Sequence, residues 1–324
     1  MAAAPDLSVL VLIGMRGCGK TANGKAAAKA LGRTFVDLDD VFEEETGTGI
    51  NEFVDEHGWP AMRALEADIL ARALTGKPLA GHSYGADNPV VFACGGGVIE
   101  TPESVVALKR FCGVVFVDRN IADIVEYLEG AGSYRPGLGD HPATIFERRL
   151  PLYEQCCDYQ FTIPKGDNDF DGINNDCGRL MTFITGDSDP AASTKAGAAV
   201  LSLARPEYGG LTAADVTVSA GGVVELRADM LAQTDGAFVH EQISRIRRHL
   251  PKDVPLRFVL RTAANGGEFV GEEDNIFRIL GYAVTAGVEI IDVELCWSEG
   301  ARDRLRESCS KSNSRLRPFL QSKL

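Results

Sequence analysis

Short apolar runs alternate with amphipathic stretches through the first half of the chain. Apolar runs bounded by turn residues are typical of strands buried on both faces, and apolar positions spaced three and four apart are typical of helices. The runs predict strands at 8–13, 35–40, 90–94 and 113–117. The amphipathic stretches predict helices at 22–31, 41–45, 50–57, 59–74, 121–128 and 144–155. This alternating order predicts an α/β fold in which helices cover both faces of a parallel sheet, giving three α/β/α layers.

The pattern changes after a small, polar, proline-containing stretch at 187–198. Beyond it, apolar and charged residues alternate within short runs, as in VELR at 224–227 and DVE at 292–294. Such alternation predicts strands with one apolar face and one charged face, as in a β/α barrel with a polar interior. The expected strands lie at 199–203, 223–227, 255–261 and 289–295, and the expected helices at 240–249 and 272–286.

These patterns divide the chain into two parts. We expect a first domain at 1–186, a linker at 187–198 and a second domain at 199–324. A complete (β/α)8 barrel takes about 250 residues, and roughly half of that number follows the linker. The second domain is therefore expected to be an incomplete barrel segment that does not close within this chain.

The motif GMRGCGKT at Gly14–Thr21 fits the pattern G-x-x-x-x-G-K-[ST] of a phosphate-binding loop. It follows the first predicted strand and precedes the first predicted helix, which is the context that this loop requires. Glycines let backbone N–H groups close on phosphate oxygens, and the helix N-terminus adds a favourable dipole. Lys20 would add a point charge, and Thr21 a hydroxyl ligand for a metal ion.

Two further segments follow predicted strands. Asp37 and Asp39 come at the end of the 35–40 run, and three successive glycines, Gly95–Gly97, follow the 90–94 run. Ligands of parallel α/β sheets gather at the carboxyl ends of the strands, so both segments are expected to face the phosphate-binding loop. Three glycines after a core strand are entropically costly, which favours a close backbone approach to a ligand over a simple turn.

Three arginines are candidates for holding an anion. Arg63 lies three residues before Glu66 on a predicted helix, and this spacing by itself favours a surface salt bridge that contributes little energy. Arg149 lies late in the 144–155 helix. Arg135 is the only cation of the glycine- and proline-containing stretch 130–142, whose composition is that of a mobile lid.

Composition excludes several classes of protein. Lys and Arg number 33 against 46 Asp and Glu, giving a net charge of -13, which argues against nucleic acid or an anionic membrane as a partner. The N-terminus lacks a signal-peptide pattern, and no stretch approaches about 20 apolar residues. We expect a soluble cytoplasmic protein. Its 8 cysteines lack paired spacing, so no zinc site is expected.

Residues 167–172 match the first half of a calcium-binding loop. Gly178 occupies the position at which such a loop needs a bidentate glutamate. The segment is therefore interpreted as a solvated acidic loop.

The first domain resembles shikimate kinase, in the form found in the fungal-type pentafunctional AROM polypeptide. The resemblance rests on ordered segments: GMRGCGKT, FVDLD, Arg63-x-x-Glu66, CGGG, Tyr134-Arg135-Pro136 and RLPLY at 149–153. It implies a P-loop kinase that transfers the γ-phosphate of ATP to the 3-hydroxyl of shikimate, in chorismate and aromatic amino acid biosynthesis.

The resemblance also implies how ATP and Mg²⁺ are bound. Thr21 and Asp37 would position the magnesium ion. The ATP phosphates would be held by Gly17, Cys18, Gly19, Lys20 and Thr21, with Arg135 closing over them.

For shikimate, the resemblance implies that Asp39 binds the ring hydroxyls and accepts a proton from the attacking one. Arg63 and Arg149 would clamp the shikimate carboxylate. The Arg63–Glu66 pair is then interpreted as part of the binding site rather than as a surface salt bridge. The ring would contact Gly95, Gly96 and Gly97. The catalytic residues would be Lys20, Asp39 and Arg135.

The second domain resembles the opening strands of type I 3-dehydroquinate dehydratase, the domain that follows the kinase in AROM. Glu225, Arg227 and Arg261 match site residues of that family. The family's histidine and its Schiff-base lysine lie further along than this chain extends, so we expect no dehydratase activity. The resemblance is expected to end at Trp297.

Two other functions stay open at this point. Fungal quinate repressors resemble the last three AROM domains, so a non-catalytic regulatory protein is one alternative; the intact site residues favour the enzyme. A gluconate kinase would share the phosphate-binding loop but gives no reason for the Arg63 and Arg149 pair. The expected partners are shikimate and ATP, together with other AROM-type domains or a chain that completes the half-barrel.

Overall fold

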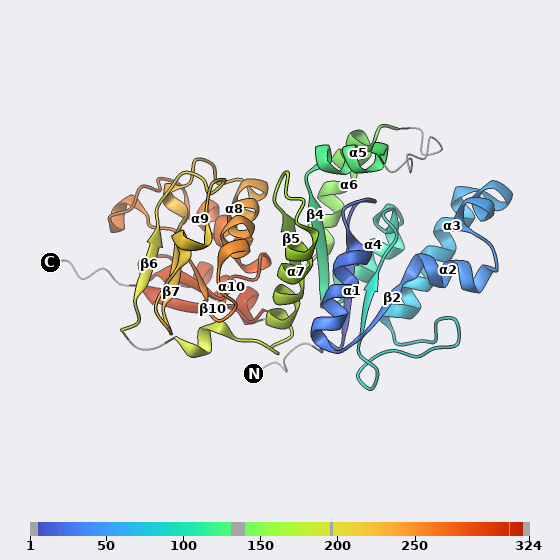
Figure 1. Cartoon of the computed structure of the whole chain (residues 1–324), viewed down its shortest axis with the longest axis horizontal. Helices are drawn as coiled ribbons and strands as arrows, with labels where there is room; N and C mark the ends of the chain where they lie inside the picture. The colour runs from blue at the N-terminus through green and yellow to red at the C-terminus, as the bar shows by residue number, and fades with distance from the viewer. Residues whose placement is uncertain (1–5, 131–139, 195–196, 311, 320–324) are drawn as a thin grey trace. The chain divides into compact units, whose positions relative to one another are not determined.

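The computed structural model of the chain describes residues 6–130, 140–194, 197–310 and 312–319. The chain forms two compact units that divide between Gly178 and Arg179 (Figure 1). The boundary falls within helix α7 (Phe170–Ile184). The domain limits expected from sequence, with a linker at 187–198, remain a prediction; that stretch contains the 3₁₀ helix η3 (Pro190–Ser193).

The first unit is built on a five-stranded parallel sheet in the order β2-β3-β1-β4-β5. Its strands are β1 (Val9–Ile13), β2 (Thr34–Asp37), β3 (Val90–Ala93), β4 (Val114–Arg119) and β5 (Tyr159–Ile163). Strands β1 and β3 are buried along their whole length, as their uninterrupted apolar runs predict. Strand β5 was not predicted.

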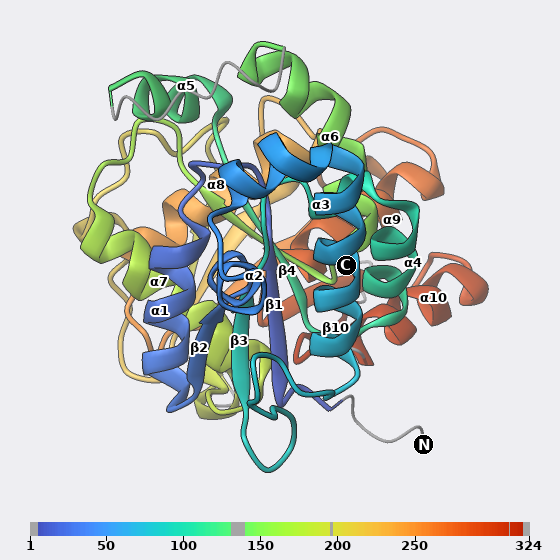
Figure 2. The ribbon, with the colours of Figure 1, turned by 90° about the vertical axis from the view of Figure 1, so that its right-hand side faces the viewer.

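Helices cover both faces of this sheet, which confirms the three-layer prediction. Figure 2 shows α1 on one side of the sheet and α3 and α4 on the other. A core of buried apolar residues joins β1, β3 and β4 to α3, α4 and α6. The helices are α1 (Lys20–Leu31), α2 (Leu38–Thr46), α3 (Ile50–Leu74), α4 (Pro102–Arg110), α5 (Ile121–Gly130) and α6 (Pro142–Cys156), with the 3₁₀ helix η1 (Val98–Glu100).

Two local expectations are corrected by the structure, and a third is confirmed. The strand expected at 35–40 ends at Asp37, because Asp37 caps helix α2 by accepting a hydrogen bond from the Asp39 N–H. The break expected at Gly58 between the helices at 50–57 and 59–74 is confirmed, because Gly58 interrupts α3 with a non-helical φ of 79° and ψ of 162°. The solvated loop expected at 167–172 contains the start of α7, since the Asp169 carboxylate accepts a hydrogen bond from the Gly172 N–H at 3.1 Å.

The second unit is a five-stranded parallel sheet that stays open, in the order β10-β9-β8-β7-β6. Its strands are β6 (Val200–Leu203), β7 (Val223–Arg227), β8 (Leu256–Val259), β9 (Ile290–Glu294) and β10 (Arg315–Phe319). The helices of this unit are α8 (Gly236–His249), α9 (Glu273–Thr285) and α10 (Glu299–Ser310). Neither α10 nor β10 was predicted, and the sheet is the incomplete barrel segment that the alternating pattern implied.

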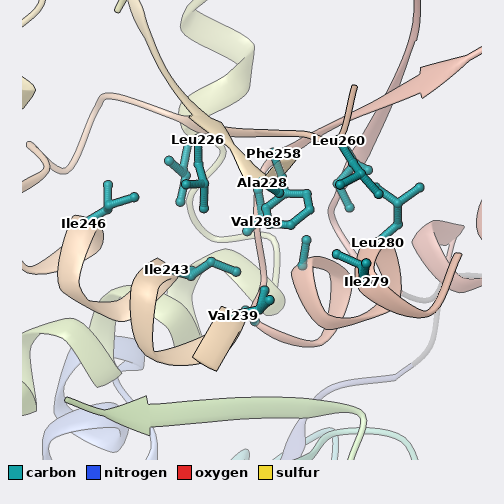
Figure 3. Packing of buried hydrophobic residues seen from close by; sticks show 14 of the residues in the cluster. Leu226, Ala228, Val239, Ile243, Ile246, Phe258, Leu260, Ile279, Leu280 and Val288 are labelled. Atoms are coloured by element: carbon teal, nitrogen blue, oxygen red, sulfur yellow. The ribbon is translucent and has the colours of Figure 1, made fainter. Parts of the chain in front are cut away.

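One face of this sheet packs on helices. Figure 3 shows Leu226 and Phe258 from the strands facing Ile243 of α8 and Leu280 of α9. All four side chains are almost completely buried. Burying side chains of this size contributes roughly 1.5–3 kcal/mol each, which makes this packing the main source of the unit's stability.

The other face carries buried ion pairs, as the alternation of charged residues predicts. The Arg257 guanidinium donates to both carboxylate oxygens of Asp292, at 2.8 and 2.6 Å. Arg257 also lies 3.4 Å from Glu225, and Arg261 donates to Asp292 at 2.9 Å. Buried charges need such partners, because an unpaired charge taken out of water is strongly unfavourable.

The buried His240 of α8 predicts how the stability of the second unit depends on pH. Burial lowers the pKa of His240 to about 4, from 6.5, although the carbonyl of Tyr282, 3.0 Å from Nε2, acts in the opposite direction. The unfolded chain therefore binds a proton that the folded chain does not, as pH falls from 6.5 towards 4. Over that range we expect a loss of about 3 kcal/mol in the free energy of unfolding.

The measurement is urea unfolding followed by the fluorescence of Trp297, in a Trp59→Phe background, between pH 7 and 4. His240→Gln is expected to flatten the pH dependence, whereas the partly exposed His249→Gln is the matched control and should follow the parent. A His240→Gln curve parallel to the parent would contradict the assignment.

Candidate functional site

The phosphate-binding loop joins β1 to α1 in the strand–turn–helix arrangement that its sequence predicts. Gly14, Gly17 and Gly19 have φ values of 147°, 81° and 99°, which side chains with a Cβ rarely adopt. A Cβ on Gly14 would also lie 2.5 Å from the carbonyl oxygen of Val117. The glycines are therefore required by the backbone path of the loop itself.

Lys20 and Thr21 begin helix α1 next to this loop. The Lys20 ammonium donates to the carbonyl oxygens of Gly14 and Met15, each at 3.0 Å, so the side chain folds back across the loop. The Thr21 hydroxyl donates to Asp37 Oδ2 at 2.9 Å. Two hard oxygen atoms thus lie together beside the loop, which is the ligand type that Mg²⁺ prefers.

The Asp37–Thr21 pair fits a magnesium ion that is held largely by phosphate and water. Among the described residues, no group of three or more His, Cys, Asp or Glu side chains is placed to hold a metal ion. Mg²⁺ is usually bound by one or two carboxylates plus substrate phosphates rather than by a protein cage, so a small ligand set is the expected one.

A cavity of about 660 Å³ brings the sequence-predicted residues together. Every one of them within the described part of the chain lines this cavity. They are Gly17, Cys18, Gly19, Lys20, Thr21, Asp37, Asp39, Arg63, Gly95, Gly96, Gly97 and Arg149. Arg135 lies outside the described residues, as do Tyr134 and Pro136.

The three glycines after β3 are explained by the side chains that crowd them. A Cβ on Gly95 would lie 2.5 Å from Glu66 Oε1 and 2.9 Å from Asp39 Oδ1. A Cβ on Gly97 would lie 2.0 Å from Arg63 Nη2. The turn therefore lacks side chains because Asp39, Glu66 and Arg63 occupy the space where those side chains would be.

Arg63 of α3 and Arg149 of α6 are held by ion pairs at the edge of the cavity. Arg63 donates to Glu66 Oε2 at 2.6 Å and to Glu100 Oε2 at 3.1 Å, and its guanidinium lies 5.4 Å from the ring centre of Trp59. Arg149 is 3% exposed and contacts both oxygens of Glu100, at 3.1 and 2.9 Å. The Arg63–Glu66 pair is thus part of a buried network rather than a solvated surface bridge.

The two glutamates of this network have opposite pKa shifts. Burial raises the pKa of the Glu66 carboxyl, and the neighbouring Arg63 offsets this only in part. Burial also acts to raise the pKa of Glu100, but Arg149, Arg148 and Arg63 outweigh it and hold that pKa below its usual value. Glu100 is therefore firmly ionised at neutral pH.

The sequence reasoning missed Glu100 and Tyr153. Glu100 ends η1, three residues after the last glycine of the turn, and nothing in its local sequence marks it. Tyr153 follows Arg149 by one helical turn, is fully buried, and donates its hydroxyl hydrogen to the Gly96 carbonyl oxygen. The i,i+4 spacing of Arg149 and Tyr153 on a helix expected to face the site was the available signal.

Arg119 and Phe170 also line the cavity and were missed as well. Arg119 is the last residue of β4, and its guanidinium lies 5.7 Å from the Phe170 ring centre. Its position at the carboxyl end of a parallel strand was the signal that could have found it. The two flat groups form a surface suited to a planar aromatic ligand.

The kinase-like and dehydratase-like segments each match a family model. The shikimate kinase model matches residues 16–170, and the type I 3-dehydroquinase model matches residues 206–316. The chain carries a shikimate kinase domain followed by a type I 3-dehydroquinase domain. The second match extends beyond Trp297, so the expectation that the resemblance ends there is wrong.

Similar proteins include the pentafunctional AROM polypeptide of Zygosaccharomyces rouxii, which is 32% identical over 303 residues. That match covers 88% of this chain and 18% of the relative, so the chain spans less than a fifth of that polypeptide's length.

Two solved structures are also similar. The shikimate kinase of Acinetobacter baumannii in complex with shikimate is 24% identical, with a TM-score of 0.46, covering 56% of this chain and 94% of that one. The dehydroquinate dehydratase and shikimate dehydrogenase of S. pombe AroM is 28% identical, with a TM-score of 0.33, covering 37% and 24%.

In the type I 3-dehydroquinase domain, the predicted residues Glu225 and Arg261 are both linked to the buried Asp292 network. Arg227 instead pairs with Asp229, at 2.8 and 2.6 Å.

No helix in the described part of the chain is both long enough and apolar enough to cross a membrane.

The glycine turn of the shikimate kinase domain predicts a cost for a single methyl group. Gly97→Ala should displace the Arg63 guanidinium from both of its carboxylate partners and lower the free energy of unfolding of this domain by about 1–3 kcal/mol. Gly130→Ala is the matched control, because Gly130 lies at the end of α5 and nothing lies within 4 Å of the place of its Cβ. Thermal unfolding checks both variants, and an equal effect at the two positions would contradict the steric account.

Proposed function

We propose that the first domain is an ATP-dependent shikimate kinase, which transfers the γ-phosphoryl group of ATP to the 3-hydroxyl of shikimate. The observation that carries the proposal is the convergence, in one cavity, of a phosphate-binding loop, an aspartate and two arginines, the half-buried Arg63 and the buried Arg149. Phosphoryl transfer needs positioning and charge neutralisation more than covalent chemistry, and this combination supplies both.

ATP occupies the part of the cavity next to the phosphate-binding loop. The loop N–H groups and the N-terminus of α1 hold the phosphates, and Lys20 turns from its two carbonyl partners towards them. Mg²⁺, when bound at Thr21 and Asp37, neutralises phosphate charge. The adenine base lies against Arg119 and Phe170, which offer a flat surface in the lining of the cavity.

Shikimate occupies the part of the cavity between Asp39 and the arginines. Asp39 accepts the proton of the attacking hydroxyl group and orients the ring by a hydrogen bond. Gly95–Gly97 line the same cavity and are the backbone segment that the ring contacts. Arg63 and Arg149 bind the substrate carboxylate, because paired guanidinium forks match a planar carboxylate in shape and charge. In this proposal, Arg135, in the segment 130–142, is the cation that closes over the ATP phosphates.

Steady-state kinetics of the full chain test this proposal. With Mg²⁺ and ATP, we expect ADP release that depends on shikimate, with a kcat/KM about 100-fold or more above that for gluconate, because the cavity is built for a rigid ring. Asp39→Asn should lower kcat about 100-fold or more, since it removes the proton acceptor. Asp40→Asn, the exposed neighbour on α2, is the matched control and should behave as the parent.

Absence of phosphoshikimate from the parent reaction, with Asp39→Asn indistinguishable from the parent, would sink the proposal. A preference for gluconate would keep the phosphoryl-transfer chemistry and overturn the choice of substrate.

For the second domain, we propose that it has the fold of type I 3-dehydroquinase but no dehydratase activity. The Schiff-base chemistry of that family needs a lysine, and Lys252 lies in a turn after α8 rather than in a matching motif. Further AROM-type domains, or a chain that completes the open sheet, are the partners that this proposal implies. The purified chain should not turn over 3-dehydroquinate in an absorbance assay, and enzymatic turnover would contradict this part of the proposal.

A further inference from the structure

Glu100 contacts three arginines at once, and it does so from outside the cavity. Its carboxylate receives hydrogen bonds from Arg63 Nη2 at 3.1 Å, Arg149 Nε at 3.1 Å and Arg148 Nη2 at 2.8 Å. Arg149 Nη2 adds a fourth contact at 2.9 Å. Arg63 and Arg149 line the cavity, whereas Glu100 and Arg148 are not among its lining residues.

This carboxylate joins two helices that each supply one of the two arginines of the site. Arg63 comes from α3 and Arg149 from α6, and η1, which ends at Glu100, packs against both helices. Two guanidinium groups drawn towards one point repel each other, so a shared anion is needed to hold them together before any substrate arrives. Glu66 bonds Arg63 but has no hydrogen bond to Arg149 among those found in the described residues.

The backbone of Glu100 is fixed by its surroundings. Val98 and Ile99 are each 1% exposed, and the Glu100 N–H donates to the Gly97 carbonyl oxygen at 2.9 Å. The residue thus follows directly from the glycine turn that the substrate ring is proposed to contact. The Glu100 side chain therefore starts from a fixed point, which suits it to support the arginines.

We propose that Glu100 is a positioning residue for the acceptor substrate: it holds Arg63 and Arg149 at a common point so that both guanidinium groups meet the substrate carboxylate. This inference rests on the proposed shikimate kinase function. Arg149 commits Nε and Nη2 to Glu100, and its Nη1 donates to Met15 Sδ at 3.7 Å, beside the phosphate-binding loop. Glu100 therefore fixes the orientation of this guanidinium at the edge of the cavity.

The test compares Glu100→Gln with Glu103→Gln in the full chain. Gln keeps the shape of Glu100 but loses the charge and one acceptor oxygen. Glu103 is exposed in the first turn of α4, three residues away, and serves as the matched control. We expect Glu100→Gln to raise the KM for shikimate about 10-fold or more while the KM for ATP stays within about 2-fold of the parent. Glu103→Gln should leave both KM values unchanged.

The preference for shikimate over its methyl ester gives a second readout that a purely structural role would not move. In the parent this preference should be large, and in Glu100→Gln it should shrink, because the arginines no longer converge on the carboxylate. If Glu100→Gln does not fold, Glu100→Asp, which keeps the charge but is one methylene shorter, replaces it with the same expectation.

Three results would overturn the inference. A lower KM for shikimate in Glu100→Gln would mean that Glu100 competes with the substrate carboxylate for the two arginines. An unchanged KM would remove its role, and a parallel rise in both KM values would reduce that role to general stability. Calorimetric titration of the parent with shikimate separates the two proposals: a parent that binds and phosphorylates shikimate leaves only Glu100 in question, and one that does neither overturns both.

Discussion

The parallel pairing of the first sheet is the constraint on which the candidate site depends. Strand β1 pairs with β3 on one side and β4 on the other, all in the same direction, and β2 pairs with β3. Their carboxyl ends therefore meet at one edge, where the chain leaves β1 into the phosphate-binding loop and β3 into the glycine turn. Asp37 and Arg119, the last residues of β2 and β4, join them there. No single loop builds this cavity; the direction of the strands does.

Charge is the second constraint, because a chain with a net charge of -13 is proposed to bind two anionic ligands. The structure reconciles these facts by pairing its cations locally. Arg63, Arg148 and Arg149 surround Glu100, and Glu66 adds a second carboxylate to Arg63. Arg148 also lies 3.5 Å from Asp140, so every arginine of this cluster has a carboxylate partner. The acidic surface elsewhere carries the net charge of the chain.

Sequence reasoning predicts this site where local patterns decide it. The phosphate-binding loop follows from its spacing between a strand and a helix, and the glycine turn from the cost of three glycines after a core strand. Sequence reasoning places Asp39 wrongly on a strand. The segment FVDLD looks like one extended run, but the hydrogen bond from the Asp39 N–H to Asp37 begins helix α2 inside it. The same reasoning misses the start of α7 for a similar reason, since the capping Asp169 lies inside a calcium-like motif.

Glu100 could not have been predicted in this way. Its partners lie 37 and 49 residues away along the chain, on two helices whose approach is set by the whole core. A single glutamate after two buried aliphatic residues has no distinctive local pattern. The same holds for the open second sheet: alternation predicts its charged face, but the particular pairing of Arg257 with Asp292 depends on the relation between neighbouring strands.

The central claim is that Arg149 grips the acid group of the substrate beside the phosphate-binding loop. The most direct measurement is the binding of shikimate and of its methyl ester, by calorimetry, to the parent and to Arg149→Gln. The account predicts that the parent prefers shikimate by about 30-fold or more and that the variant loses most of this preference, because one partner of a desolvated charge pair is gone. The same preference in both proteins would contradict it.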